Sequence, residues 1–192
     1  MSKPREWVDG KAGGSIPLDD RGLNYADGAF ETMSCSSGEM ACRSLHSDRL
    51  ALALGALRFP DPTALVQQVF DDVCRCVESV GHSGTARLTV TRGSGPRGYA
   101  PAEPALPRYI LRLFPPLERA PETQACGVAV TRWAHQPQLA GLKLLARTEQ
   151  VLAAQEAADA KADAEQALQS GDEEAAFEAV KLAEDAAHYA QK

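Results

Sequence analysis

The sequence predicts an α+β fold, in which two helices pack on an antiparallel sheet and a helical hairpin follows. Three observations lead to this prediction. Turn-forming residues are concentrated in residues 1–147, which hold all 12 prolines and all but one of the 15 glycines. Short runs of alternating or β-branched residues lie between these turns, as is typical of strands. From Thr148 onward, the chain is rich in alanine and charged residues, a composition that favours helix.

Four runs between the turn signals have the composition of strands. They are GAFETMSC at 28–35, ARLTVTRG at 86–93, RYILRLF at 108–114 and GVAVTRW at 127–133. Because their order is a strand, two helices and then more strands, we expect an antiparallel sheet with the helices packed on it.

The first helix is predicted within SLHSDRLALALGAL, residues 44–57. Its spacing places Leu50, Leu54 and Leu57 on one face. Either Ser47 or Asp48 is a candidate for the N-cap, because both residue types accept hydrogen bonds from the first backbone N–H groups.

The second helix is predicted over 61–81, with Asp61 as the N-cap before Pro62. Its apolar residues recur every three or four positions, which indicates one buried face. That face is formed by Val66, Val69, Phe70, Val73 and Val77.

The segment after Thr148 is predicted to be an αα-hairpin. Gly171 interrupts the helical pattern, and Ser170 followed by Glu173 has the spacing of a capping box. The two helices should therefore cover about 148–168 and 172–190. The predicted organisation is an N-terminal α+β domain at 1–118, a strand and loop at 119–147 and the hairpin at 148–192.

Composition excludes several classes of protein. The net charge is −6, and residues 153–192 carry ten acidic residues against three lysines, so the rest of the chain is close to neutral. A nucleic-acid surface would need a basic patch, and no apolar run is long enough to span a membrane. Five cysteines without paired spacing indicate reduced thiols rather than a disulfide framework or a metal site. With no apolar leader at the N-terminus, we expect a cytoplasmic protein.

Four motifs, in order along the chain, resemble one family. These are IPLDDRGLNYADGAFETM at 16–33, LHSDRL at 45–50, RGSGPRGYAP at 92–101 and LAGLKLLARTEQVLAAQEA at 139–157. Together they resemble the aminodeoxychorismate lyases of the fold-type IV pyridoxal-phosphate enzymes, which form 4-aminobenzoate and pyruvate in folate biosynthesis. The resemblance implies that family's N-terminal fold and a homodimer.

The resemblance also implies roles for four residues. Lys143 would form the Schiff base with pyridoxal 5′-phosphate and shuttle a proton, and its leucine neighbours would favour the neutral amine by desolvation. Arg49 would bind the cofactor phosphate through its planar guanidinium. Arg97 and Tyr99, in the glycine-rich loop, would border the substrate pocket, and Arg97 would meet a substrate carboxylate.

The sequence departs from the family pattern at and after the lysine. Ala146 stands where the family usually has asparagine, and Thr148 where it has an aliphatic residue. Residues 158–192 show no match to the family's second domain, which supplies a glutamate to the pyridine nitrogen. A truncated lyase-like enzyme is therefore one interpretation, and an inactive remnant or chimera that acts as an interaction module is another. A branched-chain or D-amino acid aminotransferase is the third, against which RGSGPRGYAP favours the lyase branch.

Overall fold

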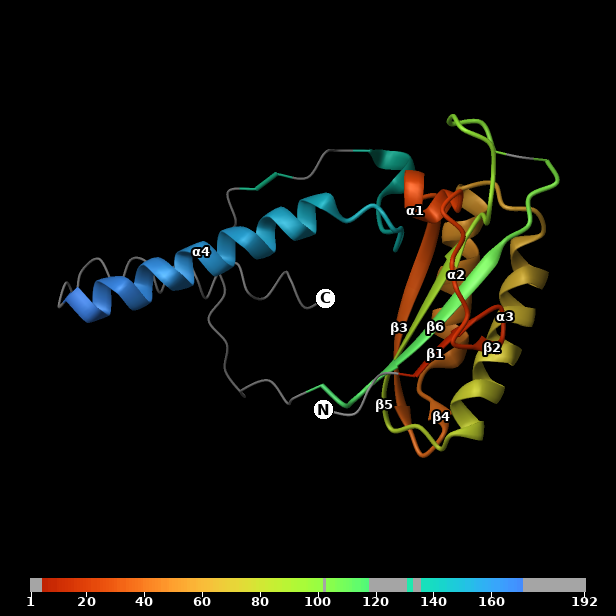
Figure 1. Cartoon of the computed structure of the whole chain (residues 1–192), viewed down its shortest axis with the longest axis horizontal. Helices are drawn as coiled ribbons and strands as arrows, with labels where there is room; N and C mark the ends of the chain where they lie inside the picture. Colours follow the sequence, from red (N-terminus) through yellow and green to blue (C-terminus); the bar gives the residue numbers. More distant parts are fainter. Residues whose placement is uncertain (1–4, 102, 118–130, 133–135, 171–192) are drawn as a thin grey trace. The chain divides into compact units, whose positions relative to one another are not determined.

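The computed structural model describes residues 5–101, 103–117, 131–132 and 136–170. The chain forms two compact units (Figure 1). One contains residues 1–117 and 137–146, and the other contains 118–136 and 147–192.

A six-stranded antiparallel sheet forms the first unit, in the order β2-β1-β6-β5-β3-β4. The strands are β1 (Arg5–Val8), β2 (Lys11–Ala12), β3 (Gly28–Ser36), β4 (Glu39–Met40), β5 (Gly84–Thr91) and β6 (Arg108–Phe114). The strands predicted at 28–35, 86–93 and 108–114 are confirmed as β3, β5 and β6. The run at 127–133 falls mostly outside the described residues. The short strands β1, β2 and β4 were not predicted, because each is too short to show alternation.

Helices α2 (Arg43–Ala56) and α3 (Pro62–Ser79) pack on one face of this sheet, which we name the helix face. The predicted buried face of α3 is confirmed, since all five of its apolar residues are at most 3% exposed. Asp61 is the N-cap, and its carboxylate accepts a hydrogen bond from Ala64 N at 3.2 Å. Together these features confirm the predicted α+β fold with two packed helices.

The predicted start of α2 is wrong by several residues. The helix begins at Arg43, and its N-cap is Cys42, whose side chain makes no capping hydrogen bond. Ser47 and Asp48 therefore lie inside the helix. Cys42 has a φ of 51°, so a left-handed backbone turn at the end of the β3–β4 hairpin starts the helix where no capping residue marks it.

The cap of α3 leads to a stability prediction. Replacing Asp61 with alanine should lower the free energy of unfolding by about 1 kcal/mol, because an N–H group at the helix start loses its acceptor. Urea unfolding followed by circular dichroism measures this change. Asp48→Ala is the matched control on α2, and it should change stability by less than about 0.5 kcal/mol because Asp48 is exposed and caps nothing. Equal losses in both variants would contradict the assignment of the cap.

A one-turn helix, α1 (Arg21–Tyr25), precedes β3 and carries residues that matter for the site. Its N-cap Asp20 is fully buried and accepts hydrogen bonds from Gly22 N and Leu23 N. Thr91, at the end of β5, donates to the same carboxylate at 2.9 Å. The start of α1 is thereby held against the end of the central strand.

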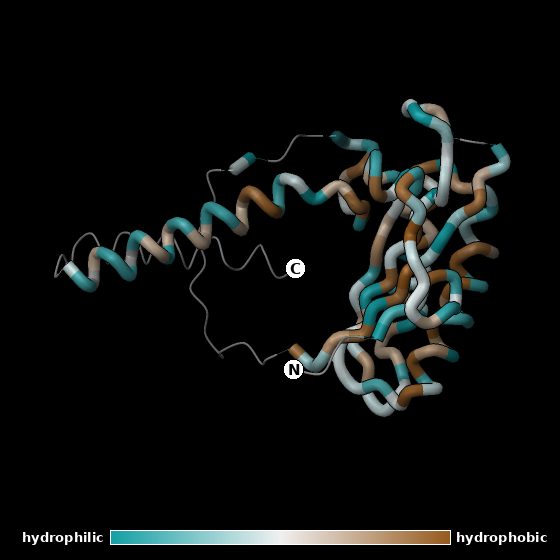
Figure 2. Tube along the Cα trace, in the orientation of Figure 1, coloured by the Kyte–Doolittle hydropathy of each residue, from teal (hydrophilic) through white to brown (hydrophobic). Residues whose placement is uncertain are grey.

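The second unit contains α4 (Thr148–Ser170), which confirms the first helix of the predicted hairpin. The second, predicted at 172–190, lies outside the described residues. Figure 2 colours α4 mostly teal and pale, with brown near its N-terminal end. On this helix Glu156 accepts hydrogen bonds from the backbone and the hydroxyl of Thr131, at 3.0 and 2.9 Å. Within the described residues, no helix is both long and apolar enough to cross a bilayer.

Candidate functional site

The segment that carries Lys143 is paired with the start of β3. Phe30 N donates to Lys143 O, and Leu145 N donates to Gly28 O, both at 3.1 Å. Glycine fits position 28 because a Cβ there would lie 2.2 Å from Val90 O on β5 and 2.9 Å from Leu145 Cδ1 in the lysine segment. The lysine is therefore held on the sheet by backbone hydrogen bonds, not on a loose loop.

The pairing also decides which way the lysine points. Leu144 forms a β-bridge with Ala29, and both belong to the core under the helices. Because neighbouring side chains on a strand alternate, Lys143 lies on the opposite face of the sheet, which we name the second face. There its Nζ atom is 4.9 Å from the centre of the Phe30 ring, and the lysine is half-buried. The apolar surroundings expected for Lys143 are thus supplied in part by Phe30.

A buried carboxylate lies next to this segment. Glu31 is fully buried on the helix face, and its side chain binds two residues of α2. Arg49 donates from Nε to Oε1 at 2.7 Å and from Nη2 to Oε2 at 2.5 Å. His46 Nδ1 lies 2.8 Å from Oε2, and it must donate, because an ionised carboxylate only accepts.

Glu31 remains ionised despite its burial. Burial alone would raise its pKa, but the hydrogen bonds from Arg49 and His46 and the charges of Arg49 and Lys143 hold the pKa below its usual value. The negative charge of Glu31 thus orients Arg49 and also acts on Lys143. Through this one carboxylate the structure links the lysine and the arginine that the sequence singled out.

The second face of the sheet carries an excess of positive charge. Arg87 on β5 stacks over the Phe30 ring, with its guanidinium carbon 4.3 Å from the ring centre. It lies directly opposite Arg112 on β6, which pairs with Glu6 at 2.9 Å. Burial and the charge of Arg112 lower the pKa of Arg87. Among the described residues no acidic side chain forms an ion pair with Arg87.

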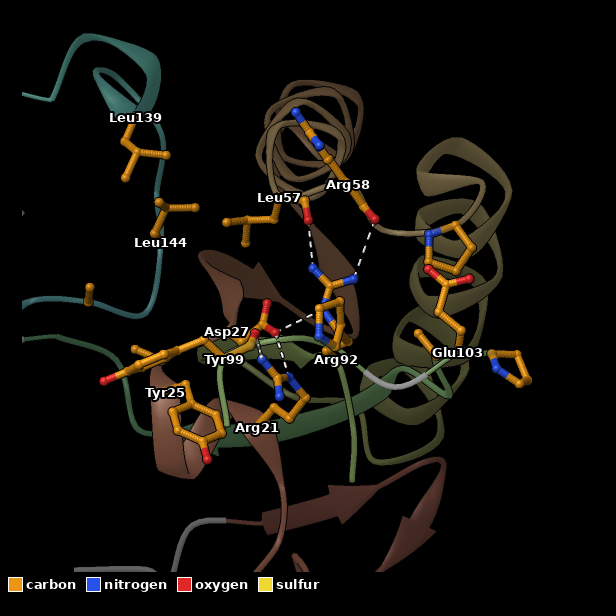
Figure 3. Close-up of a pocket in the computed structure, with 16 residues that line it drawn as sticks. Arg21, Tyr25, Asp27, Leu57, Arg58, Arg92, Tyr99, Glu103, Leu139 and Leu144 are labelled. Carbon is orange, nitrogen blue, oxygen red and sulfur yellow. Dashed lines mark hydrogen bonds and ion pairs between the residues drawn. The ribbon is translucent and has the colours of Figure 1, made fainter. Parts of the chain in front are cut away.

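A cavity of about 950 Å³ opens at the end of the sheet, next to the lysine segment. Figure 3 shows Arg21, Tyr25 and Asp27 from the α1 region, and Arg92 and Tyr99 from the chain after β5, around it. Leu144 and Ala146 form part of its wall. The cavity therefore lies between the glycine-rich loop and the segment that follows Lys143.

The structure brings some of the predicted site residues together and not others. Lys143 and Arg49 both interact with Glu31, and Tyr99 lines the cavity whose wall contains Leu144. Arg97 is exposed in the same loop and is not among the residues that line the cavity. The roles of these four residues stay predictions.

Sequence reasoning did not single out Glu31, Phe30 or Arg87. A signal for Glu31 was present, because the alternation in GAFETMSC puts this acid on the same face as Ala29 and Met33. A carboxylate among core residues indicates a specific partner. No local sequence pattern distinguishes Arg87. Its position beside Phe30 on β3 and opposite Arg112 on β6 follows from the pairing of the strands.

Comparison with known proteins gives a consistent family. The family described as amino-transferase class IV matches residues 28–177. An aminodeoxychorismate lyase of Vibrio harveyi is 32% identical over 151 residues, which cover 77% of this chain and 55% of that protein. The crystal structure of 4-amino-4-deoxychorismate lyase from Pseudomonas aeruginosa is 40% identical with a TM-score of 0.68, over 77% of this chain and 54% of that one.

More distant structures share the fold alone. The branched-chain amino acid aminotransferase of Escherichia coli has a TM-score of 0.63 at 16% identity, over 82% of this chain and 54% of that one. The chain thus spans about half the length of each of these relatives.

Proposed function

Because this chain belongs to the amino-transferase class IV family, we propose that it performs 4-amino-4-deoxychorismate lyase chemistry with pyridoxal 5′-phosphate. The observation that carries the proposal is the position of Lys143. Its segment is hydrogen-bonded to β3 through the backbone, and its amine faces the Phe30 ring. Two relatives named as this lyase, at 32% and 40% identity, support the lyase over the aminotransferase branch. The reaction would release pyruvate and 4-aminobenzoate.

Two residues of the chain offer groups that this cofactor needs, Lys143 from the second face and Arg49 from the helix face, and both interact with Glu31. Lys143 offers an amine that is half-buried beside Phe30. Arg49 is 45% exposed, and its hydrogen bonds to Glu31 use Nε and Nη2, so Nη1 remains for a phosphate oxygen. Glu31 would orient Arg49 for this contact rather than compete with it. When bound, pyridoxal phosphate supplies an aldehyde and an electron-withdrawing ring.

Each residue of the site would then have a defined task. Lys143 would hold the cofactor and carry a proton to and from the substrate. Phe30 would cover one side of the Lys143 amine and limit its contact with water. Arg87, stacked on the same ring and without an acidic partner among the described residues, would bind a carboxylate of the substrate.

The test is to add pyridoxal phosphate to the purified chain, reduce with borohydride and map the modified lysine by peptide mass spectrometry. We expect close to one label per chain, on Lys143. Formation of pyruvate and 4-aminobenzoate from 4-amino-4-deoxychorismate is then assayed. Labels scattered over exposed lysines such as Lys161 would contradict a built site. That outcome would favour the inactive interaction module, and amine transfer to a keto acid would favour an aminotransferase.

The role of Arg87 leads to its own prediction. Arg87→Met should raise KM by about 10-fold or more, because a charge-assisted contact to a substrate carboxylate is lost. The matched control is Arg112→Met on the same face, where the guanidinium is paired with Glu6, and its KM should change less than threefold. Steady-state kinetics of both variants decides the matter. Similar KM values for the wild type and Arg87→Met would contradict the assignment.

A further inference from the structure

One buried arginine holds the glycine-rich loop against α1. Arg21 is 3% exposed, and it donates from Nη1 to Gly98 O and Ala100 O at 3.1 and 3.2 Å. From Nη2 it donates to Tyr99 O at 2.8 Å. Three successive carbonyl groups of the loop thus accept hydrogen bonds from one guanidinium.

The same guanidinium is tied to the end of α2. Arg21 Nε donates to Asp27 Oδ2 at 2.9 Å, and Arg92 Nε donates to the same oxygen at 2.8 Å (Figure 3). Arg92 in turn donates to the carbonyl groups of Leu57 and Arg58, just after α2. A single carboxylate therefore joins the loop and the helix end, and backbone carbonyls accept hydrogen bonds from the η nitrogens of both arginines.

Three further contacts fix the loop in the same place. Tyr25 Oη accepts a hydrogen bond from Gly98 N at 2.9 Å, and its ring meets that of Tyr99 edge-on at 5.7 Å. At position 95 an added Cβ would lie 2.8 Å from Arg21 Cδ. Glycine at 95 therefore leaves the space through which the Arg21 side chain reaches the loop.

We infer that Arg21 is a positioning residue, which fixes the loop at 97–100 and so sets where Tyr99 stands at the cavity and where the exposed Arg97 is held. Arg21 borders the cavity but is 3% exposed, and its donors are used by Asp27 and the loop carbonyls, so we expect it to act on a ligand mainly through the loop. The inference rests on the proposed function in one respect, namely that Arg97 and Tyr99 bind a substrate. The fixing of the loop does not depend on that function.

The test measures how often the loop opens, with trypsin as the probe. Arg97 is exposed and is followed by glycine, so trypsin can cut after it once the loop leaves α1. In Arg21→Met we expect cleavage after Arg97 to be about tenfold faster or more, because proteolysis follows the open population and several hydrogen bonds to a charged group are lost. Cleavage after Arg87 and Arg112, inside strands β5 and β6, should stay slow.

Two variants keep the test decisive. Gly95→Ala leaves every polar group in place and displaces only the Arg21 side chain, so it should also accelerate cleavage after Arg97. Arg43→Met, which removes a surface ion pair with Asp71, is the control and should leave the rate unchanged. An unchanged rate after Arg97 in both test variants would overturn the inference. Equal acceleration at the strand sites in both would overturn it too, because Arg21 would then serve only global stability.

Kinetics separates the positioning role from a structural one. If the chain has lyase activity, Arg21→Met should raise KM about fivefold or more while kcat stays within about twofold, because the loop and not the lysine is displaced. An equal fall of kcat would contradict a role through the loop. If the wild type shows no activity, the proposed function fails while the trypsin result still decides whether Arg21 holds the loop.

Discussion

Replacing Lys143 with alanine should abolish the labelling by pyridoxal phosphate and borohydride, and should lower lyase kcat/KM by about 10⁴-fold, the upper end of what a positioned proton-transfer group contributes. The reason is that Phe30 and the backbone pairing with β3 give one particular amine its surroundings. The backbone hydrogen bonds that pair this segment with β3 do not involve the lysine side chain, so the substitution leaves them in place. The fold should therefore survive the substitution.

Two controls sharpen this experiment. Lys161→Ala removes an exposed amine from α4 and should leave both labelling and turnover unchanged. Lys143→Arg keeps a positive charge beside Phe30 but offers no neutral amine, so it should be as inactive as the alanine variant. Turnover by Lys143→Ala within tenfold of the wild type would show that the lysine does not carry the reaction.

The fold was most predictable where several local signals agree. For α3, an aspartate cap, a proline in the first turn and an apolar stripe all indicate the same helix, and the structure follows them. For α2 the capping signals at Ser47 and Asp48 competed with a tight backbone turn at Cys42, and the turn decided the helix start. A left-handed residue that is not glycine leaves no sequence signal of this kind.

The site was predictable only to the extent that its residues belong to motifs. Lys143 and Arg49 were singled out in this way, but the link between them was not, because Glu31 is 18 residues from Arg49 and far more distant from Lys143. Arg21 is a stronger example, since its carbonyl partners lie 77 to 79 residues further along the chain. Such contacts follow from the order of strands in the sheet, and that order was not read from local patterns.

The buried carboxylate gives the second large effect. Glu31→Gln should lower the free energy of unfolding by about 2–3 kcal/mol, because hydrogen bonds to a charged group are replaced by weaker ones in a buried place. The side chain of glutamine also presents an NH2 donor on one side. The guanidinium of Arg49 has only donors, so it cannot form a hydrogen bond with that NH2 group. Glu6→Gln, on the second face, is the matched control, because its pair with Arg112 is about half exposed and should contribute less than about 1 kcal/mol.

The pH dependence of the free energy of unfolding separates the contribution of the Glu31 charge from that of its packing. The pKa of Glu31 is lowered in the folded state, so its contribution to stability is complete above the unfolded-state pKa of about 4.3 and is lost as the pH falls through the lower folded value. Urea unfolding from pH 7 to pH 3 should therefore show the gap between wild type and Glu31→Gln constant down to about pH 5 and narrowing below about pH 4. A gap that stays constant over the whole range would mean that the carboxylate stabilises the fold by packing alone. Arg49 would then not depend on the charge of Glu31 for its orientation.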